Sequence, residues 1–127
     1  MKTLLIDTDP GVDDALAIMM ASAHPDTQIK AITTVAGNVG LEHTTENACK
    51  LVEILDIDAP IYVGCGDSLL DNPVEESAGF HGSDGLGDCI GDADIPPASI
   101  KPENGHAATA ICSYANQNTG TLDLVAL

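Results

Sequence analysis

Four aspartates crowd into a short stretch near the N-terminus, LLIDTDPGVDDALAI (residues 4–18), at positions Asp7, Asp9, Asp13 and Asp14. Carboxylates this close repel one another. Two of them could lie in the first turn of a helix, where the macrodipole favours negative charge. Helix capping and solvation do not account for Asp7 and Asp9, which follow an apolar run. A hard cation such as Ca²⁺ takes several oxygen ligands and offsets the repulsion. We therefore predict a divalent-cation site that Asp9 and Asp14 both reach.

A cation at this position would also give the carboxylates a chemical task. It would lower the pKa of a nearby water, and an adjacent carboxylate could then accept the proton. The histidines of the chain are weaker candidates for ligands. We expect His24 and His43 on the surface and His106 at the start of a helix.

The elements that must position the aspartates alternate between two kinds of hydrophobic pattern. Short apolar runs predict strands over 3–7, 29–37, 60–64 and 121–127. Helical spacing predicts helices over 12–23, 41–55 and 106–117. This alternation predicts an α/β fold, an open, mainly parallel sheet with helices on both faces. The carboxyl ends of the strands then bring together the aspartates, the GNVG stretch at 37–40 and the glycine-rich loop after 64.

The helical patterns also predict which side chains face the core. The first helix should bury Leu16, Met19, Met20 and Ala23. The second should bury one stripe of six side chains, namely Leu41, Thr45, Ala48, Leu51, Val52 and Leu55. The segment 64–105 shows no sustained periodicity, and a loop of that length in a compact domain is more often functional than idle.

Composition excludes some kinds of partner. The chain has 127 residues, the size of one domain, and 44% of them are hydrophobic. Twenty acidic residues face four lysines and no arginine, which gives a net charge of −16. Such a surface repels nucleic acid and anionic membranes and suits small neutral ligands and cations.

The cysteines and the N-terminal residues indicate the cellular compartment of the protein. Cys49, Cys65, Cys89 and Cys112 show no metal-finger spacing, which favours buried, reduced thiols over disulfides. The N-terminus begins like a signal peptide, but Asp7 interrupts its apolar stretch. No apolar run is long enough to span a bilayer. These features predict a cytoplasmic protein.

Three motifs resemble one known family. DTDPGVDDALA (7–17) closely resembles the N-terminal signature of the inosine–uridine-preferring nucleoside hydrolases. VAGN (35–38) and FHGSDGLGD (80–88) resemble two further motifs of that family, in the same order. Family members are usually more than twice this length. The resemblance therefore implies that residues 1–127 are the N-terminal portion of a single nucleoside hydrolase domain whose C-terminal half is absent.

The resemblance also implies a calcium site and a catalytic base. Asp9 matches the residue that contacts Ca²⁺ and acts as general base, and Asp14 matches the bidentate calcium ligand. Asp7 matches a supporting acid near the metal. Leu127 falls where the family supplies a main-chain carbonyl to the calcium.

The substrate implied by the resemblance is a small ribonucleoside. Asp13 and Asn38 match residues that hydrogen-bond the ribose hydroxyls, and His81 matches a histidine near the base-binding end of the pocket. The implied reaction is calcium-dependent hydrolysis of the N-glycosidic bond to ribose and free nucleobase, a step of purine and pyrimidine salvage. Its transition state would resemble an oxocarbenium ion.

Two alternatives remain open at this stage. The family's C-terminal half supplies a further calcium-binding aspartate and a histidine that assists the leaving base. A chain without them could fold and bind Ca²⁺ without turnover, and its uncovered apolar surface would favour self-association into homo-oligomers. The second alternative is a haloacid-dehalogenase-type phosphatase, because DTDPGV is similar to a D-x-D-x-[TV] nucleophile loop. Gly11 stands where that loop has Thr or Val.

Overall fold

The computed structural model describes residues 1–70, 78–88 and 95–127 and contains a four-stranded parallel sheet. The strands are β1 (Lys2–Thr8), β2 (Thr27–Thr34), β3 (Ile61–Val63) and β4 (Leu122–Ala126). Their order is β3-β2-β1-β4, and each neighbouring pair is parallel. The predicted open parallel sheet is confirmed.

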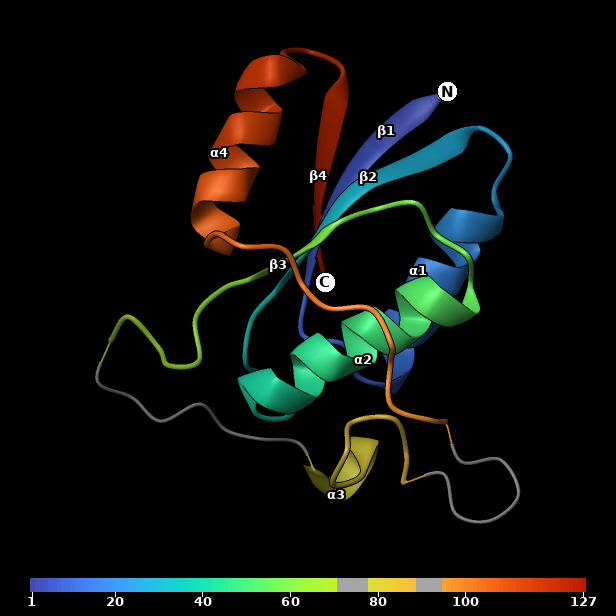
Figure 1. The fold of residues 1–127 in the computed structure, drawn as a ribbon, viewed down its shortest axis with the longest axis vertical. Coiled ribbons are helices and arrows are strands. Elements are labelled where there is room, and N and C mark those ends of the chain that lie inside the picture. Colours follow the sequence, from blue (N-terminus) through green and yellow to red (C-terminus); the bar gives the residue numbers. More distant parts are fainter. Residues whose placement is uncertain (71–77, 89–94) are drawn as a thin grey trace.

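Helices cover both faces of this sheet. They are α1 (Val12–Ala23), α2 (Leu41–Ile54), the short α3 (Ala78–His81) and α4 (Ala107–Gln117). In Figure 1, α1 and α2 lie on one side of the strands and α4 lies on the other. The sequence predicted α1, α2 and α4 but not the single turn of α3, which is too short to show a period.

The strand order contains a reversal beside β1. The chain steps outward from β1 to β2 and β3, then returns to place β4 on the other side of β1. In doubly wound sheets, ligands bind outside the carboxyl ends of the strands at such a reversal, because the connecting loops diverge there. Asp9 follows β1 and Leu127 follows β4, so both lie at this switch point.

The main hydrophobic core lies between the sheet and the two helices α1 and α2. Ile6 of β1, Ile32 of β2, Ile18 of α1 and Ala48 of α2 are each at most 2% exposed and belong to one packed cluster. Val125 of β4 packs against it. Strand β1 is apolar along its middle because side chains on both of its faces are covered.

The prediction for the buried face of α1 was wrong. Leu16 is 58% exposed and Met20 is 68% exposed, and Met19 and Ala23 are also exposed. Ile18 is buried instead. This helix is apolar around most of its circumference, so spacing alone does not select a face. The hydrogen bond from the Thr8 hydroxyl to the buried Asp14 carboxylate turns one face of α1 toward the sheet. Ile18 lies four residues after Asp14 and therefore on the same face.

The stripe predicted for α2 was largely right. Ala48, Leu51 and Val52 are buried as expected. Thr44 rather than Thr45 is fully buried at the start of the helix, because its hydroxyl donates to the carbonyl of Val35 at 2.9 Å. Leu41, Thr45 and Leu55 are half-buried.

The cysteines differ from the prediction in part. Cys49 is a buried free thiol, but Cys65 and Cys112 are exposed free thiols. Cys89 lies outside the described residues. Strand β2 also ends at Thr34, so residues 35–37 form a loop rather than the end of a strand.

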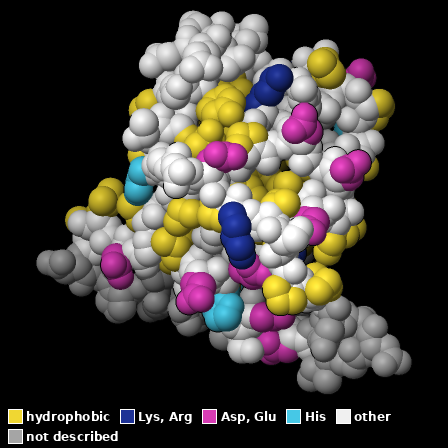
Figure 2. Space-filling model, viewed as in Figure 1, with side chains coloured by type: hydrophobic (Ala, Val, Ile, Leu, Met, Phe, Trp, Pro, Cys, Tyr) yellow, Lys and Arg dark blue, Asp and Glu magenta, His cyan; other side chains and the backbone are white. Residues whose placement is uncertain are grey.

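The surface agrees with the composition. Figure 2 shows acidic side chains spread over the viewed face, with far fewer lysines among them. Within the three described ranges, no helix is long and apolar enough to cross a bilayer.

Candidate functional site

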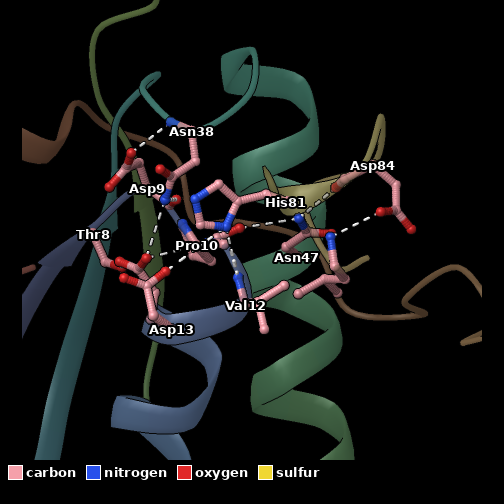
Figure 3. A network of polar contacts seen from close by, with 12 residues as sticks. Thr8, Asp9, Pro10, Val12, Asp13, Asn38, Asn47, His81 and Asp84 are labelled. Carbon is pink, nitrogen blue, oxygen red and sulfur yellow. Dashed lines mark hydrogen bonds and ion pairs between the residues drawn. The ribbon is translucent and has the colours of Figure 1, made fainter. Parts of the chain in front are cut away.

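Asp9 and Asn38 join the ends of β1 and β2. The backbone N–H of Asn38 donates to Asp9 Oδ2 at 2.6 Å, and the Asn38 side-chain amide donates to the backbone carbonyl of Asp9 at 3.0 Å. Figure 3 shows Asp9 and Asn38 next to each other, with a dashed line from the Asn38 backbone nitrogen to the Asp9 carboxylate. The stretch that follows β2 therefore lies on the stretch that follows β1, as the parallel arrangement predicts.

Asp14 is only 5% exposed, and three hydrogen-bond donors hold its carboxylate in place. Its Oδ1 accepts a hydrogen bond from the Thr8 hydroxyl at 2.6 Å, and its Oδ2 accepts from the backbone N–H of Gly11 at 3.3 Å. The Asn38 side-chain amide also donates to Oδ2, at 3.2 Å. These donors offset part of the cost of burying a carboxylate.

Two glycines make this approach possible. A Cβ at Gly11 would lie 2.6 Å from His81 Nδ1 and 2.7 Å from the Asn38 amide nitrogen. A Cβ at Gly37 would collide with the carboxylate of Asp9. The glycines of DPGVDD and VAGN therefore leave room for the loops to close around Asp9.

His81 caps the first turn of α1 from the side. It is 6% exposed, and its Nδ1 accepts a hydrogen bond from the backbone N–H of Val12 at 3.2 Å. The same atom lies 3.8 Å from Asp13 Oδ1, whose side chain is 77% exposed. A backbone N–H can only donate, so Nδ1 is the acceptor and the neutral ring carries its proton on Nε2.

Two carboxylates in the loop after His81 accept hydrogen bonds from groups of the same loop and so hold its conformation. Asp84 Oδ1 accepts from the backbone N–H groups of Leu86 and Asp88 at 2.8 and 3.0 Å. Asp88 Oδ1 accepts from the backbone and the hydroxyl of Ser83 at 2.8 and 2.6 Å. These hydrogen bonds from Ser83 lower the pKa of the Asp88 carboxyl below its usual value.

Asn47 links this loop to the loop after β1, and sequence reasoning missed it. It lies on α2, is 1% exposed, and donates through Nδ2 to the carbonyls of Pro10 at 3.1 Å and Asp84 at 2.7 Å (Figure 3). The sequence did offer one indication. Asn47 directly precedes Ala48 of the apolar stripe of α2, and a polar side chain buried at such a position is expected to be hydrogen-bonded.

Asp7 and Leu127 lie beside each other at the carboxyl end of β1. The backbone N–H of Leu127 donates to the carbonyl of Asp7 at 3.0 Å. The Asp7 carboxylate accepts from the Thr33 hydroxyl at 2.6 Å. Side chains alternate along a strand, so Asp7 points to the face opposite Thr8 and Asp14.

Electrostatics set Asp9 apart. Burial raises the pKa of its carboxyl above the usual value of 3.8, and the negative charges of Asp14 and Asp13 raise it further. The hydrogen bond from the Asn38 N–H opposes this. A nearby positive charge, or a proton on the carboxylate itself, would therefore stabilise Asp9.

Asp9 and Asp14 are suitable ligands for a hard cation. Among the residues that the structure describes, no group of three or more His, Cys, Asp or Glu side chains is placed to hold a metal ion. The available donors are two carboxylates whose charges repel, and a cation would relieve that repulsion. Oxygen donors favour Ca²⁺ or Mg²⁺ over Zn²⁺.

A separate hollow of about 700 Å³ lies between α2 and residues 97–102. Its lining includes Glu46, Cys49, Lys50 and Lys101 but none of the candidate site residues. The histidines are placed as predicted: His24 and His43 are exposed, and His106 is the N-cap of α4.

The comparisons with known proteins decide the family. The family model for inosine-uridine preferring nucleoside hydrolase matches residues 4–127. This chain belongs to that family. The chain is 37% identical over 127 residues to uridine nucleosidase 1 of Arabidopsis thaliana, covering 99% of this chain and 37% of that protein. It is 45% identical over 83 residues to the non-specific ribonucleoside hydrolase RihC of Salmonella agona, covering 65% of this chain and 27% of that protein.

Solved structures of nucleoside hydrolases share the fold. The plant nucleoside hydrolase PpNRh1 superposes with a TM-score of 0.87 at 37% identity, over 99% of this chain and 39% of that one. A purine-preferring ribonucleoside hydrolase from Gardnerella vaginalis gives a TM-score of 0.87 at 32% identity, over 98% and 40% of the two chains. The chain therefore spans well under half the length of the relatives it matches. The phosphatase alternative is wrong, since the whole matched range belongs to another family.

Proposed function

We propose that this chain supplies the catalytic and ribose-binding N-terminal part of a calcium-dependent ribonucleoside N-ribohydrolase. The observation that carries the proposal is the meeting of Asp9, Asp14 and Asn38 at the switch point of the sheet, in a chain of the nucleoside hydrolase family. Each of the three comes from a motif that resembles the family.

Asp9 is the proposed general base. A raised pKa makes a carboxylate a better proton acceptor near neutral pH, and burial raises that of Asp9. The Asn38 N–H fixes Oδ2 at 2.6 Å, which leaves the other carboxylate oxygen for the proton. Calcium, when bound, would supply the positive charge that lowers the pKa of a water and draws in the ribose hydroxyls.

Asp9, Asp14 and the main-chain carbonyl of Leu127 are the proposed calcium ligands, with Asp7 in support. Asp14 is restrained by the Thr8 hydroxyl and the Gly11 N–H, so little side-chain entropy remains to be lost on binding. Leu127 is placed beside Asp7 by its own backbone hydrogen bond.

Asp13, Asn38 and His81 are the proposed substrate-binding residues. The exposed Asp13 carboxylate can accept hydrogen bonds from ribose hydroxyls. The Nε2–H of His81 is a donor that a nucleobase acceptor could use. Departure of the base leaves positive charge on the ribose, which nearby carboxylates stabilise.

The test measures base release and calcium binding on the same variants. The purified protein is incubated with inosine and with uridine in millimolar Ca²⁺, with and without a chelator. Asp9→Asn should abolish release of free base, and Asp14→Asn should weaken calcium affinity at least about tenfold by calorimetry. Asp58→Asn is the matched control, because Asp58 is exposed and follows α2 away from the site. Turnover that survives Asp9→Asn would contradict the proposal.

A second candidate function is calcium binding without turnover. It is favoured by the two-carboxylate donor set and by the length of the matched relatives. Calcium affinity that depends on Asp14, together with no base release from either nucleoside, would select this alternative.

We also propose a cytoplasmic homo-oligomer engaged in purine and pyrimidine salvage. The unpaired thiols Cys49, Cys65 and Cys112 suit a reducing compartment. The exposed apolar side chains of Leu16, Met20 and Leu124 provide surface for self-association. Light scattering coupled to size exclusion measures the assembly, and a monomer at micromolar concentration would contradict it.

A further inference from the structure

A cysteine and a histidine outside the candidate site lie within hydrogen-bond distance of each other. Cys65 Sγ is 3.7 Å from His106 Nε2. Cys65 follows β3 and His106 is the N-cap of α4, and both side chains are exposed. A ligand or reagent can therefore reach the pair from solvent.

The backbone holds the two residues in register. Val63 and His106 pair in an isolated parallel bridge, and the carbonyl of Cys65 accepts the N–H of Ala36 at 3.0 Å. The contact therefore joins two anchored segments rather than two free chain ends.

A second hydrogen bond determines which nitrogen of His106 carries the proton. His106 Nδ1 accepts the backbone N–H of Ala108 at 3.2 Å, as an N-cap acceptor. Because that nitrogen is an acceptor, the neutral ring has its proton on Nε2, which faces Cys65. The imidazole is thus a donor to the sulfur, and it cannot also take the thiol proton without losing the cap.

We propose that Cys65 and His106 form a reactive thiol–imidazole pair, a site of covalent modification by small uncharged disulfides and electrophiles. The sulfur carries negative charge while it attacks a disulfide or an electrophile, and the Nε2–H of His106, 3.7 Å away, is placed to donate a hydrogen bond to it during that attack. The first turn of α4 adds the positive end of a helix dipole.

The modification is an ordinary thiol–disulfide exchange. The Cys65 thiol first loses its proton to water. The thiolate then attacks one sulfur of the reagent, the reagent's S–S bond breaks as a new S–S bond forms, and the departing thiolate takes up a proton from water. No net oxidation of the system occurs, since the reagent supplies the disulfide.

The surroundings favour an uncharged organic reagent. A cavity of about 200 Å³ is lined by His106 together with Tyr62, Thr109 and Tyr114. It offers space for a small organic group next to the imidazole. The net charge of −16 repels anionic reagents.

The test uses the neutral reagent 2-hydroxyethyl disulfide on the intact chain, with acid quenching and peptide mass spectrometry to follow each cysteine. Cys112 is the internal control, because it is an exposed cysteine on α4 that forms no disulfide. Cys65 should react at least about threefold faster than Cys112, because the imidazole N–H stabilises the charge on the attacking sulfur by roughly the worth of one hydrogen bond.

His106→Asn separates the pair from the helix cap. Asparagine is a strong N-cap residue and can still accept the Ala108 N–H, but it removes the imidazole from the sulfur. The variant should keep its helical circular dichroism, and the rate at Cys65 should fall to that at Cys112. Equal rates in the wild type, or an unchanged rate at Cys65 in the variant, would overturn the proposal.

Discussion

Asn38 donates its side-chain amide to the buried carboxylate of Asp14 at 3.2 Å, which joins the loop after β2 to the first turn of α1. The same amide nitrogen is 3.0 Å from the Asp9 carbonyl. One side chain thus fixes the relative positions of two loops that the chain separates by an entire helix and strand.

Replacing Asn38 by alanine should destabilise the fold. The change removes a donor from a buried carboxylate, and hydrogen bonds to charged groups contribute roughly 1.5–3 kcal/mol. We expect a loss of about 2 kcal/mol in the free energy of unfolding, measured by urea denaturation. Asn104→Ala, at an exposed loop position, is the control and should change it little. Equal effects of the two substitutions would show that the hydrogen bonds of the Asn38 amide contribute nothing to the free energy of unfolding.

Gly37→Ala should displace the Asp9 carboxylate. The added Cβ would collide with it, and overpacking typically costs about 1–3 kcal/mol. Denaturant melts should show this loss. Gly79→Ala is the matched control, because a Cβ there meets nothing within 4 Å. A Gly37 variant as stable as the Gly79 variant would mean that the loop moves aside freely.

Removing Asn47 should loosen two loops at once. Asn47→Ala leaves the carbonyls of Pro10 and Asp84 without their shared donor, and an unsatisfied buried group costs about 1–3 kcal/mol. Hydrogen exchange should accelerate in residues 82–88 together with the turn before α1. Asn116→Ala, exposed on α4, should leave both segments unchanged. Faster exchange in one segment only would contradict the bridging role.

The contact between α2 and residues 98–100 should weaken in acid. Hydrogen bonds from Ser99, and then from the N–H of Ile100, lower the pKa of Glu53 below its usual 4.5. A lowered pKa means that this stabilisation is fully present above 4.5 and is lost as the pH falls through the folded-state value. Exchange at the Ser99 amide, referenced to a mobile peptide, should therefore increase below pH 4.5. Glu53→Gln should remove that pH dependence, and an identical profile in the variant would exclude Glu53 as the cause.

The parts of the structure that sequence could predict are those governed by local pattern. Apolar runs located all four strands, because strands buried in a parallel sheet carry little else and the more exposed β4 still has partly covered Leu122 and Val125. The face of α1 was missed because Leu16 and Met20 are as apolar as Ile18, and the choice depends on the Asp14–Thr8 hydrogen bond. Asn47 was missed because its partners are backbone carbonyls, which no sequence pattern marks. The site residues were found through motif resemblance, and their chemical roles remain proposals.

The position of β1 between β2 and β4 has a consequence for the nascent chain. The Lys2 ammonium forms an ion pair with the carboxylate of Asp123, 121 residues later, and the backbone of β1 pairs with that of β4 over five residues. At about 5–20 residues per second, translation leaves one edge of β1 unpaired for on the order of ten seconds. An apolar strand with an open edge is a template for wrong pairing. Strand β1 is thus a segment that a ribosome-bound chaperone would have reason to shield until β4 is made.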